Sequence, residues 1–310
     1  MSQKQYVPLY EGPLESFPES NEYPDGVKVI RLQDQFAYQV DLLPHLEYAV
    51  RNEDPLFLQL LLPKKPNSAG SSPLVVFVQG SAWHRQDIFQ HLQHMVRVCE
   101  HGYAVAIVQY RPSDIAPFPA QVQDVKTAIR FLRSRASEFC IDASSIGIWG
   151  DSSGAHTAVL VGITTDGELD TDLYAEQTAA VSCIVDWYGP TDISTMNETI
   201  SIQDHIQPDS PEGFLIGRKP VLEHPELVHP TVPMHYLSRE REIPPILMMH
   251  GSKDPLVHFH QSCMLYESLR ALDKDVTFYR LDGAYHAFGG FNSKEAVDIV
   301  RNFLDQYLSK

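Results

Sequence analysis

The chain has little cysteine, comparatively few basic residues and no long hydrophobic run. Its 310 residues include only four cysteines, which are widely spaced, so we expect buried free thiols rather than disulfides. There are 24 Lys and Arg against 40 Asp and Glu, a net charge of -16, which argues against nucleic acid or an anionic membrane as a partner. No apolar stretch is long enough to span a bilayer, and residues 1–20 lack a signal-peptide pattern. These absences predict a cytoplasmic protein. The sequence leaves the oligomeric state open, and a homodimer is one option.

The 14 histidines raise the question of a metal site. His91 and His94 are three residues apart on a predicted helix, but the sequence places no carboxylate or cysteine cluster beside them. We therefore expect no metal and no cofactor.

From Leu74 onward, short apolar runs alternate with amphipathic helices. The runs are nearly continuous, as in strands that are buried on both faces. They are Leu74–Val78, Tyr103–Val108, Ser145–Trp149, Val181–Trp187, Pro245–Met249 and Val276–Leu281. Upstream, His45–Val50 and Leu56–Leu62 flank a turn and suit a hairpin at the edge of a sheet. The alternation predicts an α/β fold, a mostly parallel central sheet with helices on both faces, whose ligand site lies beyond the carboxyl ends of the strands.

Two segments interrupt this pattern. Residues 1–26 are rich in Pro, Glu, Ser and Gly and predict an irregular lead-in, followed by a candidate first strand at Val27–Leu32. Residues 191–243 contain many Pro, His and acidic residues and predict a small inserted lid, because their apolar periodicity is too weak for a core of their own. We expect residues 1–310 to form a single domain.

The strand that ends near Trp149 leads directly into Gly150-Asp151-Ser152-Ser153-Gly154. This Gly-x-Ser-x-Gly pattern is typical of a nucleophile elbow, a tight strand-to-helix turn that exposes the serine hydroxyl. Glycine is needed on both sides because the two backbone segments approach closely. Ser152 is therefore the candidate nucleophile.

A nucleophilic serine needs a histidine base and a carboxylate that orients the base. Asp254 follows the strand that ends at Met249, and His286 follows the strand that ends near Leu281, so both are predicted at the same sheet edge as Ser152. Asp282 is the alternative acid, although it precedes His286 on the same strand exit. His250 and His156 are expected to have structural roles.

An acyl transfer also needs backbone N–H donors for the developing oxyanion. The N–H of Ser153 is one candidate, since it directly follows the nucleophile. The others are in the loop after Val78, which reads Gln79-Gly80-Ser81-Ala82-Trp83.

Together these motifs resemble the α/β-hydrolase esterases of the hormone-sensitive-lipase-like group, and within it the carbohydrate-esterase branch that includes acetyl xylan and feruloyl esterases. Further markers of the resemblance, which runs from about Leu56 to the C-terminus, are Tyr110-Arg111, Phe118-Pro119-Ala120, Asp124 and the segment Trp187–Asp192. The resemblance implies a Ser-His-Asp acyl-enzyme mechanism on a small or medium ester, such as an acetyl or feruloyl ester of a carbohydrate. Arg111 and Asp124 look like a structural ion pair.

The chain departs from this group in the oxyanion loop, where Gly80-Ser81-Ala82 stands in place of three glycines. The donating pair is open at this stage, either Gly80 with Ser81 or Ser81 with Ala82. Aromatic residues at strand exits are candidate substrate contacts, namely Trp83, Trp187, Tyr188 and Phe288. An amide hydrolase, such as a formamidase or an aminopeptidase, is the closest alternative, and a non-catalytic ligand-binding protein is a more distant one.

Overall fold

The structure is a computed structural model that describes residues 9–13, 16–29, 38–65, 70–171, 173–287 and 289–308. The chain divides into two units, Met1–Phe36 and Ala37–Lys310. In the first unit, the Tyr10 hydroxyl donates to the carbonyl oxygen of Pro13 at 3.0 Å. The strand predicted at Val27–Leu32 is absent from residues 27–29, and its remaining positions lie outside the described residues.

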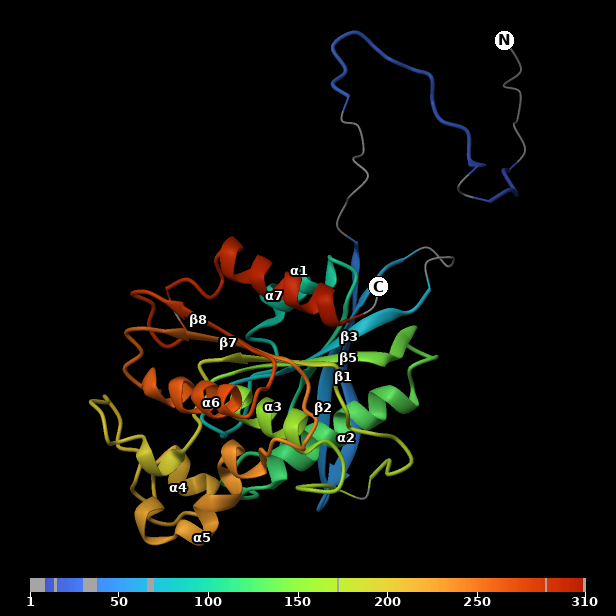
Figure 1. Ribbon diagram of the computed structural model, residues 1–310. Helices are drawn as coiled ribbons and strands as arrows, with labels where there is room; N and C mark the ends of the chain where they lie inside the picture. Colours follow the sequence, from blue (N-terminus) through green and yellow to red (C-terminus); the bar gives the residue numbers. More distant parts are fainter. Residues whose placement is uncertain are drawn as a thin grey trace, which may run out of the picture. The chain divides into compact units, whose positions relative to one another are not determined.

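In the described part of the second unit, eight strands form one sheet in the order β1-β2-β4-β3-β5-β6-β7-β8 (Figure 1). The strands are β1 (Val40–Arg51), β2 (Asp54–Pro63), β3 (Ser72–Val78), β4 (Ala104–Val108), β5 (Ile141–Asp151), β6 (Cys183–Trp187), β7 (Ile246–Gly251) and β8 (Val276–Leu281). β2 is antiparallel to both β1 and β4, and the pairs from β4 through β8 are parallel. The predicted edge hairpin and the mostly parallel sheet are both confirmed.

Helices cover both faces of the sheet. They are α1 (Leu92–Cys99), α2 (Ala120–Ser134), α3 (Ser153–Thr164), α6 (His260–Ala271) and α7 (Lys294–Tyr307). α1 and α7 lie on one face, whereas α2, α3 and α6 lie on the other (Figure 1), and each group buries its apolar stripe in a separate core cluster. The predicted ion pair is present, since the Arg111 guanidinium donates to both oxygens of Asp124 at 2.8 Å.

One expectation from the sequence is wrong: Cys140 is exposed, in the turn before β5, whereas Cys99 and Cys183 are buried free thiols. Pro119 is the N-cap residue of α2. Ser293 caps α7, because its hydroxyl accepts the N–H of Ala296 at 3.2 Å.

The insertion, residues 191–243, consists of short helical turns. They are η2 (Ile193–Thr195), α4 (Pro211–Leu215), η3 (Val221–Glu223), α5 (Pro225–Val228), η4 (His229–Thr231) and η5 (Pro233–Tyr236). Contrary to expectation, these turns enclose an apolar cluster of their own, Ile193, Leu215, Ile216, Val221, Val228 and Val232 together with Trp83. The cluster has no helical period because none of the short turns contributes more than two of its residues.

Across the described ranges, no helix combines the length and the apolar character that crossing a membrane requires.

Candidate active site

The connection between β5 and α3 is a single residue, Ser152. Its φ is 51°, a left-handed conformation that is rare for a residue with a side chain. A Cβ on Gly150 would lie 2.4 Å from the carbonyl oxygen of Gly154, so a side chain cannot be accommodated there. The strained serine between two closely packed glycines is the geometry of a nucleophile elbow.

Three side chains from separate loops meet at the carboxyl edge of the sheet. The Ser152 Oγ lies 2.9 Å from Nε2 of His286, and Nδ1 of His286 lies 2.6 Å from Oδ2 of Asp254. A carboxylate can only accept a hydrogen bond, so Nδ1 carries the proton and Nε2 presents its lone pair to the serine hydroxyl. The predicted nucleophile, base and acid are therefore in hydrogen-bonding reach of one another.

Asp254 is held rigidly and stays ionised. Its side chain is fully buried, and its Oδ1 accepts the N–H groups of Leu256 and Val257, both at 2.9 Å. Burial alone raises the pKa of Asp254, but hydrogen bonds from His250 and His286 and the charges of the two imidazoles outweigh it and lower this pKa to about 2. The carboxylate can therefore orient His286 and stabilise its protonated form.

The alternative acid, Asp282, is on the surface. Its side chain is 83% exposed and pairs with Nε of Arg280 at 2.7 Å. Asp282 therefore pairs with the exposed Arg280, and the carboxylate that contacts His286 is that of Asp254.

The two other histidines near the elbow contact structural partners. Nε2 of His156 lies 2.7 Å from the carbonyl oxygen of Thr231 in the insertion, and burial lowers the pKa of His156 to about 4. A neutral His156 therefore donates to Thr231. His250 contacts Oγ of Ser262 at 2.7 Å and the carbonyl oxygen of Val257 at 2.8 Å.

The loop after β3 has most of its N–H groups occupied. The Gly80 N–H donates to Oδ1 of Asp151 at 2.8 Å, and the N–H groups of Ser81 and Trp83 both donate to Oγ of Ser153, at 2.9 and 3.1 Å. Among the described residues, the N–H groups of Ala82 and Ser153 have no hydrogen-bond partner. Neither of the two loop pairs considered from the sequence is free, because in each pair at least one N–H is already bonded.

The side chains of Asp151 and Ser153 have structural roles that are not evident from the sequence. The elbow pattern leaves both positions open, yet both are occupied by hydrogen-bond acceptors and both accept N–H groups of the neighbouring loop. The polar residues at the two variable positions of the Gly-x-Ser-x-Gly pattern were the sequence feature that could have indicated these contacts.

The four residues predicted to contact substrate lie in different surroundings. Tyr188 is buried with its ring centroid 4.8 Å from that of His286, in an edge-on arrangement. Trp187 packs in the core, with its ring centroid 4.7 Å from that of Trp149. Trp83 belongs to the apolar cluster of the insertion. Phe288 lies outside the described residues.

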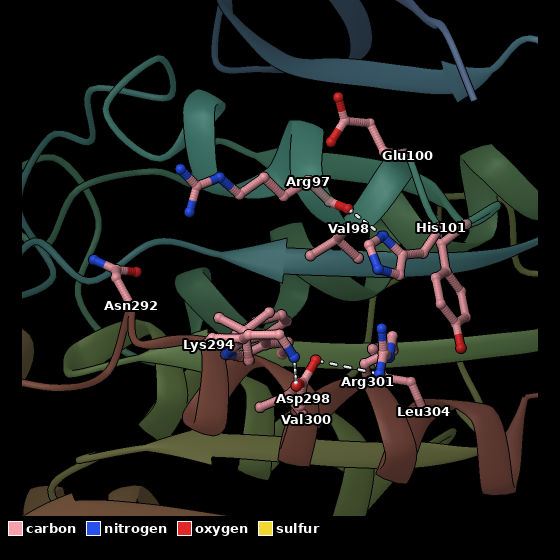
Figure 2. A pocket seen from close by; sticks show the side chains of 13 residues that line it. Arg97, Val98, Glu100, His101, Asn292, Lys294, Asp298, Val300, Arg301 and Leu304 are labelled. Atoms are coloured by element: carbon pink, nitrogen blue, oxygen red, sulfur yellow. Dashed lines mark hydrogen bonds and ion pairs between the residues drawn. The ribbon is translucent and has the colours of Figure 1, made fainter. Parts of the chain in front are cut away.

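A separate cavity of about 350 Å³ lies between α1 and α7 (Figure 2). Its lining includes none of the residues of the elbow, the acid loop or the histidine loop. Its charged groups largely satisfy one another, since Asp298 pairs with Lys294 and with Arg301, and Nδ1 of His101 lies 2.9 Å from the carbonyl oxygen of Arg97. We assign this cavity no role in the chemistry.

The sheet order, the covering helices and the elbow define an α/β-hydrolase fold. Within this class, the chain belongs to the BD-FAE family, whose sequence profile matches residues 58–269.

Curated relatives are similar to this chain over part of their own length. It is 27% identical over 270 residues to Esterase LipC of Mycobacterium tuberculosis, across 84% of this chain and 65% of that protein. It is 28% identical over 277 residues to Esterase LipQ of the same organism, across 84% of this chain and 63% of that protein. The chain thus spans less than two thirds of the length of both relatives.

Solved structures share the fold over most of the chain. A truncated form of a carbohydrate esterase from gut microbiota is similar with a TM-score of 0.75 and 28% identity, covering 88% of this chain and 98% of that one. Esterase Est2 of Thermogutta terrifontis is similar with a TM-score of 0.69 and 19% identity, covering 88% and 96%, which is a likeness of fold alone.

Proposed function

We propose that this chain is a serine carboxylesterase that works through an acyl-enzyme. The observation that carries the proposal is the continuous hydrogen-bonded series from Ser152 through His286 to Asp254, with distances of 2.9 and 2.6 Å. A serine hydroxyl is a poor nucleophile until an adjacent base removes its proton, and this series supplies both the base and the group that orients it. The similarity to proteins named esterases supports the same reaction class.

In the acylation step, Oγ of Ser152 attacks the ester carbonyl carbon while Nε2 of His286 accepts the hydroxyl proton. The carbonyl electron pair moves onto the carbonyl oxygen, and the unpaired N–H groups of Ala82 and Ser153 are the donors that we propose for this oxyanion. The bond between the carbonyl carbon and the alcohol oxygen then breaks, and His286 returns its proton to the departing alcohol. Asp254 stabilises the imidazolium throughout.

In the deacylation step, water takes the place of the alcohol. His286 accepts a proton from the water, whose oxygen attacks the acyl carbon, and the same two N–H groups stabilise the second oxyanion. Breaking the bond to Oγ releases the carboxylic acid, and His286 returns the proton to Ser152.

We further propose that the substrates are small or medium esters, with acetyl or feruloyl esters of carbohydrates as the first class to test. Membership of the BD-FAE family and the 28% identity to a structure named a carbohydrate esterase support this choice. A net charge of -16 favours neutral esters over highly anionic ones.

The deciding experiment combines active-site labelling with a substrate panel. The wild-type chain should react with a fluorophosphonate probe and hydrolyse p-nitrophenyl acetate, whereas Ser152→Ala should do neither while keeping its thermal melt. Turnover retained by Ser152→Ala would overturn the proposal. The panel should contain acetylated xylan oligomers, methyl ferulate and aminoacyl amides, and a kcat/KM that is highest for the amides would favour an amide hydrolase instead.

A further inference from the structure

The side chain of Ser153 occupies an unusual position between the elbow and the loop Gly80–Trp83. Its Oγ accepts two backbone N–H groups of this loop, from Ser81 at 2.9 Å and from Trp83 at 3.1 Å, and the residue is only 2% exposed. The Gly-x-Ser-x-Gly pattern does not require a hydroxyl here. A buried hydroxyl that bonds a neighbouring loop therefore calls for another explanation.

The two bonds select which N–H group of the loop is left for a ligand. Ser81 and Trp83 lie on either side of Ala82, and both of their N–H groups point to Ser153. The N–H of Gly80 is bonded to Asp151, and that of His84 is bonded to the carbonyl oxygen of Ser81 at 3.0 Å. Ala82 is the one position between Gly80 and His84 whose N–H is unpaired within the described structure.

The backbone conformation of the loop Gly80–Trp83 has to be stabilised by hydrogen bonds. Ala82 and Trp83 both have φ values of 55°, in the left-handed region that costs energy for residues with a side chain. Two side chains already support the loop: the Ser81 hydroxyl donates to the carbonyl oxygen of His84 at 2.7 Å, and the Tyr110 hydroxyl donates to that of Gln79 at 3.0 Å. Ser153 adds two further bonds from the elbow.

We propose that Ser153 is a positioning residue whose hydroxyl fixes the oxyanion loop so that the N–H of Ala82 converges with the backbone N–H of Ser153 itself. The inference rests on the proposed esterase function. One residue then contributes a donor through its main chain and sets the second donor through its side chain. Because oxyanion donors act only when they are preorganised at the developing charge, loss of the hydroxyl should weaken transition-state stabilisation more than substrate binding.

The first test is Ser153→Ala, which removes the acceptor and leaves the main-chain donor. We expect kcat for p-nitrophenyl acetate to fall about 10- to 100-fold, as for small misplacements of catalytic groups, with KM changed by less than about threefold. The Ki of a trifluoromethyl ketone, which forms an oxyanion on Ser152, should rise by a similar factor. Thr164→Val is the matched control, because it deletes a buried hydroxyl of the same helix whose one partner among the described residues is the carbonyl oxygen of Leu160. This control should keep wild-type kcat and Ki.

Results that contradict the role of Ser153 differ from results that contradict the esterase proposal. A kcat for Ser153→Ala equal to or above that of the wild type would overturn the inference, since it would mean that the freed N–H of Ser81 is an equal or better donor. A rise in KM alone would overturn it as well. Failure of the esterase proposal would show itself separately, as activity that survives Ser152→Ala.

A second measurement uses the wild-type chain alone. It therefore tests the inference even if Ser153→Ala does not fold. Hydrogen exchange with single-residue resolution on the wild-type chain should show protected N–H groups at Ser81 and Trp83 and fast exchange at Ala82, because only the first two are bonded. Exchange at Ser81 and Trp83 as fast as at Ala82 would overturn the inference.

Discussion

Nε2 of His250 lies 3.2 Å from Oδ2 of Asp254, and both side chains are fully buried. The same carboxylate oxygen lies 2.6 Å from Nδ1 of His286, so two imidazoles approach Asp254 from different elements. The other oxygen accepts two main-chain N–H groups. A carboxylate with this many partners has essentially one orientation, which fixes the ring that it contacts.

The first prediction follows from this arrangement. Asp254→Asn should lower kcat by about 10⁴-fold, because an amide can donate to Nδ1 and so favours the wrong tautomer of His286. Asp282→Asn is the matched control and should retain nearly full activity, since Asp282 is exposed and pairs with Arg280. Steady-state hydrolysis of p-nitrophenyl acetate measures both. A large loss in Asp282→Asn, or a mild one in Asp254→Asn, would contradict this assignment of the acid.

The second prediction concerns the apolar cluster of the insertion. Leu215 is fully buried in that cluster, whereas Leu222 in the same insertion is 59% exposed. Leu215→Ala should therefore lower the free energy of unfolding by about 2–5 kcal/mol, because it loses apolar contacts and leaves a cavity, while Leu222→Ala should change it by less than about 0.5 kcal/mol. Urea denaturation followed by fluorescence compares the two. Equal effects would mean that the insertion has no core of its own.

The third prediction concerns acid stability. Burial lowers the pKa of His156 to about 4, against an ordinary value of about 6.5, so the folded state favours the neutral ring. The stability that this contributes is present above about pH 6.5 and is lost as the pH falls towards 4, where the unfolded chain already carries the extra proton. Between pH 7.5 and 4.5 the wild type should therefore lose about 2 kcal/mol more than His156→Gln.

The measurement is urea denaturation of both proteins at the two pH values. His94, whose pKa burial also lowers to about 4, and Asp186, whose pKa burial raises to about 6, are present in both proteins and cancel in the difference. An equal loss in the two proteins would rule out His156 as the source.

The inner strands of the sheet were predictable because they are buried on both faces. Runs such as Leu74–Val78 have no polar position, and the structure buries every residue of β3. The elbow and the two loops that follow β7 and β8 were predictable for a related reason: parallel strands bring their carboxyl ends to one edge, so residues far apart in sequence meet there. The sequence therefore predicted the meeting of residues 152, 254 and 286, while their catalytic roles stay predictions.

Which N–H of the loop Gly80–Trp83 is left unpaired was not predictable from the sequence. The choice depends on side chains of Asp151 and Ser153 that reach a loop about 70 residues away, and a five-residue pattern holds no information on such a contact. The core of the insertion was missed for a similar reason, because its members come from separate short turns without a common period. Long-range hydrogen bonds and aperiodic packing both need the three-dimensional arrangement.

Trp83 links the loop after β3 to the insertion. Its N–H bonds to Oγ of Ser153, and its indole completes the apolar cluster of the insertion. An insertion with different apolar residues would pack poorly against this indole, and the poor packing would disturb the backbone beside Ala82. The loop Gly80–Trp83 and the insertion should therefore be exchanged together.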